Sequence, residues 1–185
     1  NNKYLDFIAG VSACSLGHKN PVVIEAIKNQ LDKYLHVMVY GEYIQQPSLD
    51  LTMLLARFLP ENIDKTYLTN SGTEAIDGAL KLARRYTGRS EIFAANKAYH
   101  GNTIGALSVM GYEERKNPFR PLLPGIRFIN FNLINDIKKI TSKTAAVILE
   151  TIQGGAGFIE PVNDYLNIIQ KRCNEVGALL ILDEI

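Results

Sequence analysis

The sequence predicts an α/β fold, with a mostly parallel β-sheet and helices on both faces. Three apolar runs, "EIFAA" (91–95), "AAVILE" (145–150) and "ALLIL" (178–182), have the length of strands but lack polar alternation. Strands of this kind are buried on both faces of a sheet. Segments with helical spacing separate them, and strands that alternate with helices form parallel sheets. We therefore expect ligand-binding residues at the carboxyl ends of the strands.

Two helices are expected in the first third of the chain. The first begins at Asn20-Pro21, because Asn is a favoured N-cap and Pro fits the first helical position. The second begins at Gln46-Pro47 and ends before residue 60. Between them lies the irregular, aromatic segment "HVMVYGEYI" (36–44). The apolar stripe of the first helix comprises Val22, Val23, Ala26, Ile27, Leu31 and Tyr34.

From residue 65 onward, strands and helices alternate. Gly88 and Gly177 are expected to end two helices, since glycine readily adopts the left-handed conformation that closes a helix. A loop rich in Pro, Gly and Asn is expected after residue 110. The expected strands are 65–69, 91–95, 126–131, 145–150 and 178–182, and the expected helices are 73–86, 102–110, 133–140 and 163–176.

Composition limits the class of protein. The 185 residues are 46% hydrophobic and carry a net charge of +1, which is globular composition without the basic face of a nucleic-acid or membrane-surface protein. No signal peptide or membrane-spanning run is recognisable. The two cysteines, Cys14 and Cys173, lie far apart, which favours a reducing compartment, the cytoplasm. Cys14 and His18 lack a second ligand pair, so no metal site is expected.

The stretch "LTNSGTEA" (68–75) joins an expected strand to a helix. Ser71, Gly72 and Thr73 stand where the first N–H groups of that helix have no internal partner and the helix dipole is positive. Such a junction is a good cradle for a phosphate. The alternative is simple capping by Ser71 or Thr73 without a ligand. Neither a nucleotide P-loop nor a dinucleotide GxGxxG motif is present.

Two further strand ends carry candidate side chains. Tyr99 in "ANKAYHG" (95–101) could lie flat against a planar ligand with His100 beside it; the alternative is a loop tyrosine that packs on the core. Asp183 ends the last strand, where a buried carboxylate needs a partner such as a cationic nitrogen; the alternative is an N-cap. Glu150 ends the strand 145–150 in the same way. A phosphate, a flat ring and a basic ring nitrogen together describe pyridoxal 5′-phosphate (PLP).

Five segments resemble the class-III (omega-amino-acid) PLP-dependent aminotransferases in order and spacing. The resemblance covers essentially the whole chain and implies the fold-type-I architecture, with residues 1–45 in a small N-terminal domain and 46–185 in the large domain. The segments are "LGHKNPVVIEAIKNQL" (16–31), "NSGTEAIDGALKLAR" (70–84), "AYHGNTIGALS" (98–108), "AAVILETIQGGAG" (145–157) and "GALLILDEI" (177–185).

The resemblance implies roles for the matching residues. Ser71, Gly72 and Thr73 would bind the cofactor phosphate, and Tyr99 would stack on its ring beside His100 and Gly101. Asp183 would pair with the ring nitrogen, near Glu150. The implied reaction is a ping-pong transfer of an amino group from an omega-amino acid, diamine or related amine to an oxo acid such as 2-oxoglutarate. The implied assembly is a homodimer with the active site at its interface.

The lysine that carries the cofactor in this family lies beyond the "DE" motif. None of Lys81, Lys97 and Lys143 matches it. We therefore expect the sequence to be the N-terminal half of an enzyme and the 185 residues alone to be inactive. An aminomutase or racemase of the same family, a non-catalytic cofactor-binding protein and a Rossmann-like phosphate binder are the alternatives.

Departures from the family pattern concern the substrate. Acetylornithine and ornithine aminotransferases usually carry Arg where this chain has Asn102, and many members carry Glu where it has Gly155. The segment "PFRPLLPGIRF" (118–128) resembles putrescine-type enzymes, which hints at a diamine or omega-amine donor. We expect Asn102 and Gln153 to contact substrate, and Tyr40 and Tyr43 to line the entrance unless they pack on the protein.

Overall fold

A computed structural model describes residues 2–38 and 41–185. Contacts divide the chain into two compact units, with the boundary between Thr66 and Tyr67. The predicted boundary after residue 45 concerns the domains of a whole enzyme and stays a prediction. The first unit contains helices α1 (Pro21–Leu31) and α2 (Gln46–Phe58), neither of which has a buried residue. The Asn20 side chain caps α1 as predicted, accepting hydrogen bonds from the next free backbone N–H groups.

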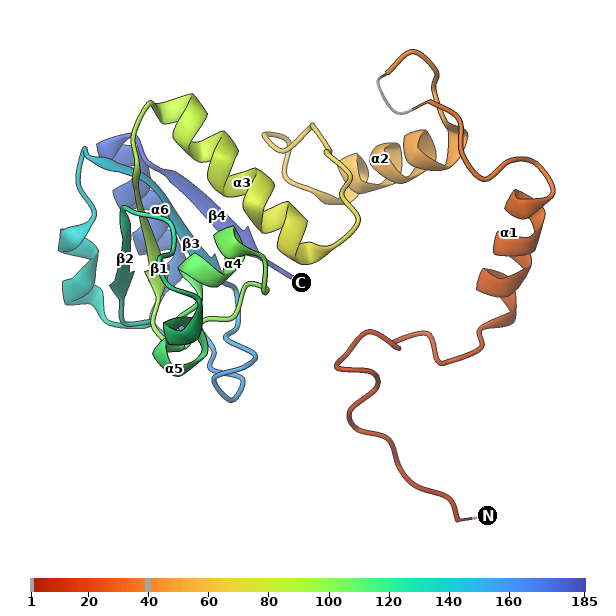
Figure 1. Ribbon diagram of the computed structural model, residues 1–185, viewed down its shortest axis with the longest axis horizontal. Helices are drawn as coiled ribbons and strands as arrows, with labels where there is room; N and C mark the ends of the chain where they lie inside the picture. Colours follow the sequence, from red (N-terminus) through yellow and green to blue (C-terminus); the bar gives the residue numbers. More distant parts are fainter. Residues whose placement is uncertain (1, 39–40) are drawn as a thin grey trace. The chain divides into compact units, whose positions relative to one another are not determined.

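The second unit is built on a four-stranded parallel sheet with strand order β2-β1-β3-β4 (Figure 1). Each strand runs parallel to its neighbour because a helical connection returns the chain to the same end of the sheet. The strands are β1 (Glu91–Ala95), β2 (Ile126–Ile129), β3 (Thr144–Glu150) and β4 (Leu179–Asp183).

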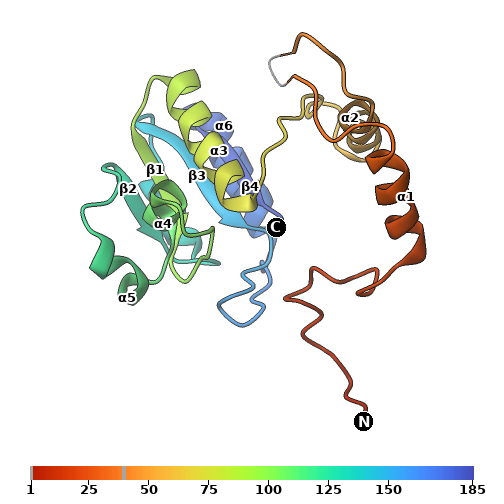
Figure 2. The same cartoon turned by 45° about the vertical axis from the view of Figure 1, so that its right-hand side comes forward.

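Helices cover both faces of this sheet (Figure 2), which confirms the predicted α/β class. Helices α3 (Gly72–Thr87) and α4 (Ile104–Val109) pack on one face, where they bury Ile92 and Ile148. Helix α6 (Tyr165–Val176) and the 3-10 helix η2 (Ile134–Lys139) pack on the other and bury Phe93 and Val147. Neighbouring strand residues thus point to opposite faces, and both faces are apolar.

The strand predicted at 65–69 is wrong for this structure. The segment has no regular structure, and the Tyr67 side chain is 86% exposed. A strand forms only beside a partner, and none of the four described strands pairs with it.

Other differences are local. In place of the α-helix predicted at 133–140, the structure has the 3-10 helix η2, Ile134–Lys139. Helix α6 begins later than predicted, because Asn163 and Asp164 have φ angles of 48° and 61°, which an α-helix excludes. The predicted loop after residue 110 contains the short helix α5 (Glu113–Lys116) and the 3-10 turn η1 (Asn117–Phe119). Gly88 and Gly177 end their helices in the left-handed conformation, as predicted.

Candidate active site

Two carboxylates lie side by side where the neighbouring strands β3 and β4 end. Glu150 and Asp183 are partners in the β3–β4 register, and each is 9% exposed. Both point to the α3 face of the sheet, because Ile148 and Ile181, two residues before them, pack there. Burial of two like charges at one sheet edge requires that each be well hydrogen-bonded.

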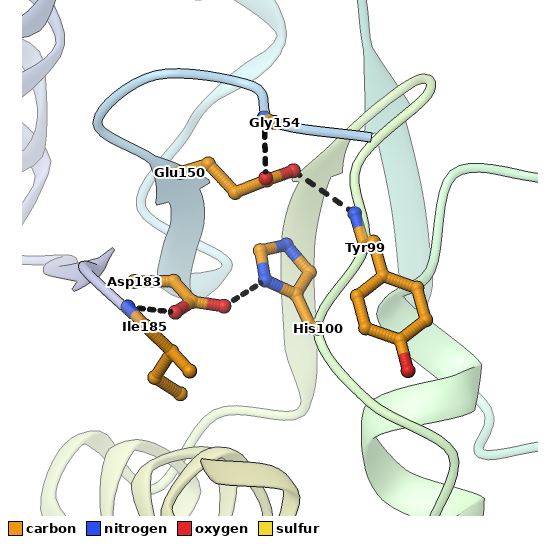
Figure 3. A network of polar contacts seen from close by, with 6 residues as sticks. All are labelled: Tyr99, His100, Glu150, Gly154, Asp183 and Ile185. Atoms are coloured by element: carbon orange, nitrogen blue, oxygen red, sulfur yellow. Dashed lines mark hydrogen bonds and ion pairs between the residues drawn. The ribbon is translucent and has the colours of Figure 1, made fainter. Parts of the chain in front are cut away.

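Asp183 is paired with His100, as Figure 3 shows. His100 Nδ1 lies 2.7 Å from Asp183 Oδ2, and their side chains are 0% and 5% exposed. The other oxygen of Asp183 accepts the backbone N–H of Ile185 at 3.0 Å. Because an ionised carboxylate can only accept, Nδ1 carries the proton. His100 Nε2 is buried and has no partner among the described residues.

Glu150 joins two loops. One oxygen accepts the backbone N–H of Tyr99 at 2.9 Å, and the other accepts the N–H of Gly154 at 3.0 Å (Figure 3). The first loop follows β1 and the second follows β3. The Glu150 carboxylate therefore fixes the position of the Tyr99 main chain relative to the two central strands.

Tyr99 is 39% exposed, so part of the residue is open to a ligand. Its hydroxyl accepts a hydrogen bond from the Asn102 amide at 3.2 Å. This bond and the hydrogen bond that the Tyr99 main-chain N–H donates to Glu150 hold the residue at both ends. An aromatic ring held in this way is a suitable platform for a flat ligand.

The start of α3 has the features of an anion site. Ser71 is the N-cap, and its hydroxyl accepts the N–H of Glu74 at 3.3 Å. The Glu74 carboxylate accepts the N–H of Asn70 at 2.8 Å. The backbone N–H groups of Gly72 and Thr73 have no hydrogen-bond partner among the described residues. Capping and anion binding are thus compatible here, because they use different N–H groups.

Gly101 lies against this helix start. Its φ is +122°, and a Cβ at this position would overlap the Thr73 side chain. The Thr73 hydroxyl is 2.7 Å from the hydroxyl of Thr103 and accepts its N–H at 3.1 Å. Sequence reasoning missed Thr103. The only signal for it was a hydroxyl residue just before the helix that follows Gly101.

The predicted substrate residues lie in different surroundings from one another. The Gln153 side chain is buried, and its amide donates to the carbonyl of Asn96 at 3.0 Å, so this group holds a loop. Tyr43 is 62% exposed and belongs to the first unit. Tyr40 lies outside the described residues. Contacts of any of them with substrate stay predictions.

The residues that meet here fit the predicted cofactor. Asp183 accepts two hydrogen bonds, and a carboxylate can accept about four, so it can also accept one from a ring nitrogen. Gly72 and Thr73 offer free N–H groups for a phosphate.

No cluster of three or more His, Cys, Asp or Glu suited to a metal occurs among the described residues. No described helix has both the length and the apolar character needed to cross a membrane.

Comparison with protein families decides the assignment. The class-III aminotransferase family model matches residues 1–185. The chain belongs to the class-III aminotransferases. This membership confirms the resemblance seen in the sequence, and it confirms PLP as the cofactor.

Individual relatives agree. Acetylornithine aminotransferase of Clostridium acetobutylicum is 42% identical over 100% of this chain and 48% of its own length. A LysW-aminoadipate semialdehyde/glutamate semialdehyde transaminase of Sulfolobus acidocaldarius is 40% identical, over 99% of this chain and 47% of its own length. The chain thus spans about half the length of these curated relatives.

Solved structures agree as well and confirm the predicted fold. An adenosylmethionine-8-amino-7-oxononanoate aminotransferase of Methanocaldococcus jannaschii superposes with a TM-score of 0.92 at 34% identity, over 100% of this chain and 45% of that one. A PLP-bound amine transaminase from an uncultivated Pseudomonas species has a TM-score of 0.86 at 25% identity, over 98% of this chain and 48% of that one.

Proposed function

We propose that the full-length protein is an aminotransferase that moves an amino group from an omega-amino acid, diamine or related amine to an oxo acid such as 2-oxoglutarate. The observation that carries the proposal is the buried His100–Asp183 pair at the end of β4, in the same unit as the free N–H groups at the start of α3. A generic phosphate binder has no use for a buried carboxylate paired in this way.

The roles of the residues follow from their chemistry. When bound, PLP supplies a protonated ring that accepts electrons from the carbon bearing the amine. Asp183 would keep the ring nitrogen protonated, because a buried negative charge favours the charged form of a neighbouring base. His100 would orient Asp183 through the bond to Nδ1. Tyr99 would support the face of the ring, and Ser71, Gly72 and Thr73 would bind the phosphate beside Gly101.

The names of the relatives support a substrate that carries an amine at one end and a carboxylate elsewhere in the same molecule. Acetylornithine and aminoadipate semialdehyde transaminases are 42% and 40% identical to this chain. An aminomutase or racemase would use the same cofactor site without net amino transfer. A non-catalytic protein would bind PLP without turnover.

We also propose a homodimer in the cytoplasm. Helix α1 exposes Val22, Ile27 and Leu31 by more than half, and a second copy of the chain would cover such a stripe. Cys14 and Cys173 are both free, which suits a reducing compartment.

The test uses the intact protein from its source. Incubation with PLP, reduction with borohydride and intact mass measurement should show one pyridoxyl group per chain. Amine donors with 2-oxoglutarate should then yield glutamate. A pyridoxyl adduct without glutamate from any donor would favour the aminomutase, racemase or non-catalytic alternatives, and absence of an adduct would reject the proposal.

A further inference from the structure

We propose that Tyr112 and Arg115 form the wall of the active site that recognises a carboxylate at the far end of the amine substrate. The inference rests on the proposed aminotransferase function and assigns residues to a substrate class. Neither residue belongs to the segments on which the family resemblance depends. The assignment comes from packing around two glycines, Gly111 and Gly155.

Gly111 brings Tyr112 to the loop that carries Tyr99. The Gly111 N–H donates to the carbonyl of Ala98 at 2.8 Å, and the N–H of Lys97 donates to the carbonyl of Gly111 at 3.0 Å. A Cβ at residue 111 would overlap the main chain of this loop, so only glycine permits the approach. The next residue, Tyr112, therefore lies at the same end of the sheet as Tyr99.

Helix α5 fixes Tyr112 in place. The Lys116 side chain is 4% exposed, pairs with Glu113 at 3.0 Å and lies 4.0 Å from the centre of the Phe128 ring. Glu113 also pairs with Arg120. Tyr112 is the N-cap residue of this anchored turn, so its main chain is held in place.

Gly155 lies next to the Tyr112 hydroxyl. A Cβ built at Gly155 would lie 3.5 Å from the Tyr112 hydroxyl and 3.7 Å from Tyr99 Cβ. The two tyrosines thus flank Gly155, whose neighbour Gly154 donates to Glu150. A side chain at this position would contact the Tyr112 hydroxyl, whereas glycine makes no such contact.

The chemistry of this wall suits a carboxylate. The Arg115 guanidinium carbon lies 4.8 Å from the centre of the Tyr112 ring. Within the described part of the chain, no hydrogen bond reaches the Tyr112 hydroxyl and no ion pair engages Arg115. A hydroxyl and a guanidinium are both donors, and a carboxylate accepts from both. The wall therefore favours amines that carry a carboxylate over simple alkylamines.

The experiment uses the full-length holoenzyme and two measurements. Calorimetry gives the Kd of glutarate, a dicarboxylate that has no amine to transfer. Kinetics compare kcat/KM for δ-aminovalerate with that for n-pentylamine, which lacks the carboxylate. Tyr112→Phe should raise the Kd of glutarate about ten-fold and lower kcat/KM for δ-aminovalerate by a similar factor, because a hydrogen bond to a charged group is lost. The value for n-pentylamine should not change.

Controls separate this inference from the function on which it rests. Arg115→Gln should weaken glutarate binding and reduce its salt dependence, whereas Tyr86→Phe and Arg85→Gln, exposed on α3, should change neither. An unchanged Kd of glutarate in Tyr112→Phe overturns the inference, as does a wild-type enzyme that uses both amines equally well. Failure of the wild type to transfer any amine instead rejects the proposed function, and glutarate binding remains measurable.

Discussion

His100 Nδ1 lies 2.7 Å from Asp183 Oδ2 in the interior of the protein, and this contact joins two segments 83 residues apart in the sequence. The carboxylate belongs to the last residue of β4, and the imidazole comes from the loop after β1. A buried Asp without a partner would be costly. The imidazole therefore stabilises the carboxylate and at the same time orients it toward the α3 side of the sheet.

Replacement of Asp183 by Asn should distinguish the effect of its negative charge from the effect of its hydrogen bonds. We expect Asp183→Asn in the full-length enzyme to keep an acceptor for His100 but to lower kcat about 100-fold or more, since loss of one preorganised electrostatic group has costs of this order. PLP affinity, measured by equilibrium dialysis, should fall as well. Near-normal turnover would refute the role of Asp183.

A matched control is Asp136→Asn. Asp136 is also a buried carboxylate with backbone and side-chain partners, and its pKa is held low chiefly by the N–H of Asn130. Asp136 lies in η2, on the other face of the sheet. This variant should lose some stability but keep PLP affinity, so a loss of affinity in both variants would indicate a general structural effect.

Much of the fold could be predicted from the sequence. β3 and β4 could be recognised because the residues between their polar ends are apolar without alternation, which is typical of a parallel strand covered on both faces. Ser71 as N-cap and Gly88 as helix end follow from local chemistry that needs no tertiary contact. Asp183 and Glu150 could be identified as site candidates because parallel strands end at one edge of the sheet.

The remainder depended on contacts between distant segments. The bond between Thr73 and Thr103 and the bond between Glu150 and the Tyr99 N–H arise only when loops meet. The predicted strand at 65–69 has the right local pattern, but strand formation needs a neighbour, which no local pattern reveals. The hydrogen bond from the Gln153 amide to the carbonyl of Asn96 likewise joins two loops, and no local pattern reveals it.

Glu150→Gln should loosen the two loops that Glu150 joins. A carboxylate can accept from both Tyr99 and Gly154, whereas an amide places an NH₂ group against one of these N–H donors. We expect a loss of roughly 1–3 kcal/mol in stability from the unsatisfied donor. Hydrogen exchange read by mass spectrometry should accelerate in peptides that contain Tyr99 or Gly154. Glu175→Gln, on α6 and half-exposed, is the control. If exchange in the peptides that contain Tyr99 or Gly154 accelerates equally in this variant, the role of Glu150 is contradicted.

Gly101→Ala should damage the predicted phosphate site. Its φ of +122° disfavours any side chain, and the new Cβ would overlap Thr73 at the start of α3. We expect PLP affinity to fall at least about ten-fold and stability to fall by roughly 1–3 kcal/mol. Gly78→Ala is the control within α3, where an added Cβ meets nothing within 4 Å; it should gain roughly 1 kcal/mol. Unchanged PLP affinity in Gly101→Ala would argue against the predicted phosphate site.

Tyr165 predicts an alkaline limit to stability. Burial raises the pKa of its phenol from 10.0 to about 12, and its ring packs edge-on against Phe131 at 5.2 Å. Because the folded-state pKa is the higher one, the folded protein keeps a proton that the unfolded chain loses between these values. The contribution of this group to the free energy of unfolding should therefore be constant below pH 10.0 and fall as pH rises toward about 12.

Urea unfolding at a series of alkaline pH values should show this fall in the free energy of unfolding, and Tyr165→Phe should remove it. The exposed Tyr86→Phe serves as the control; if both variants keep the slope, another group causes it.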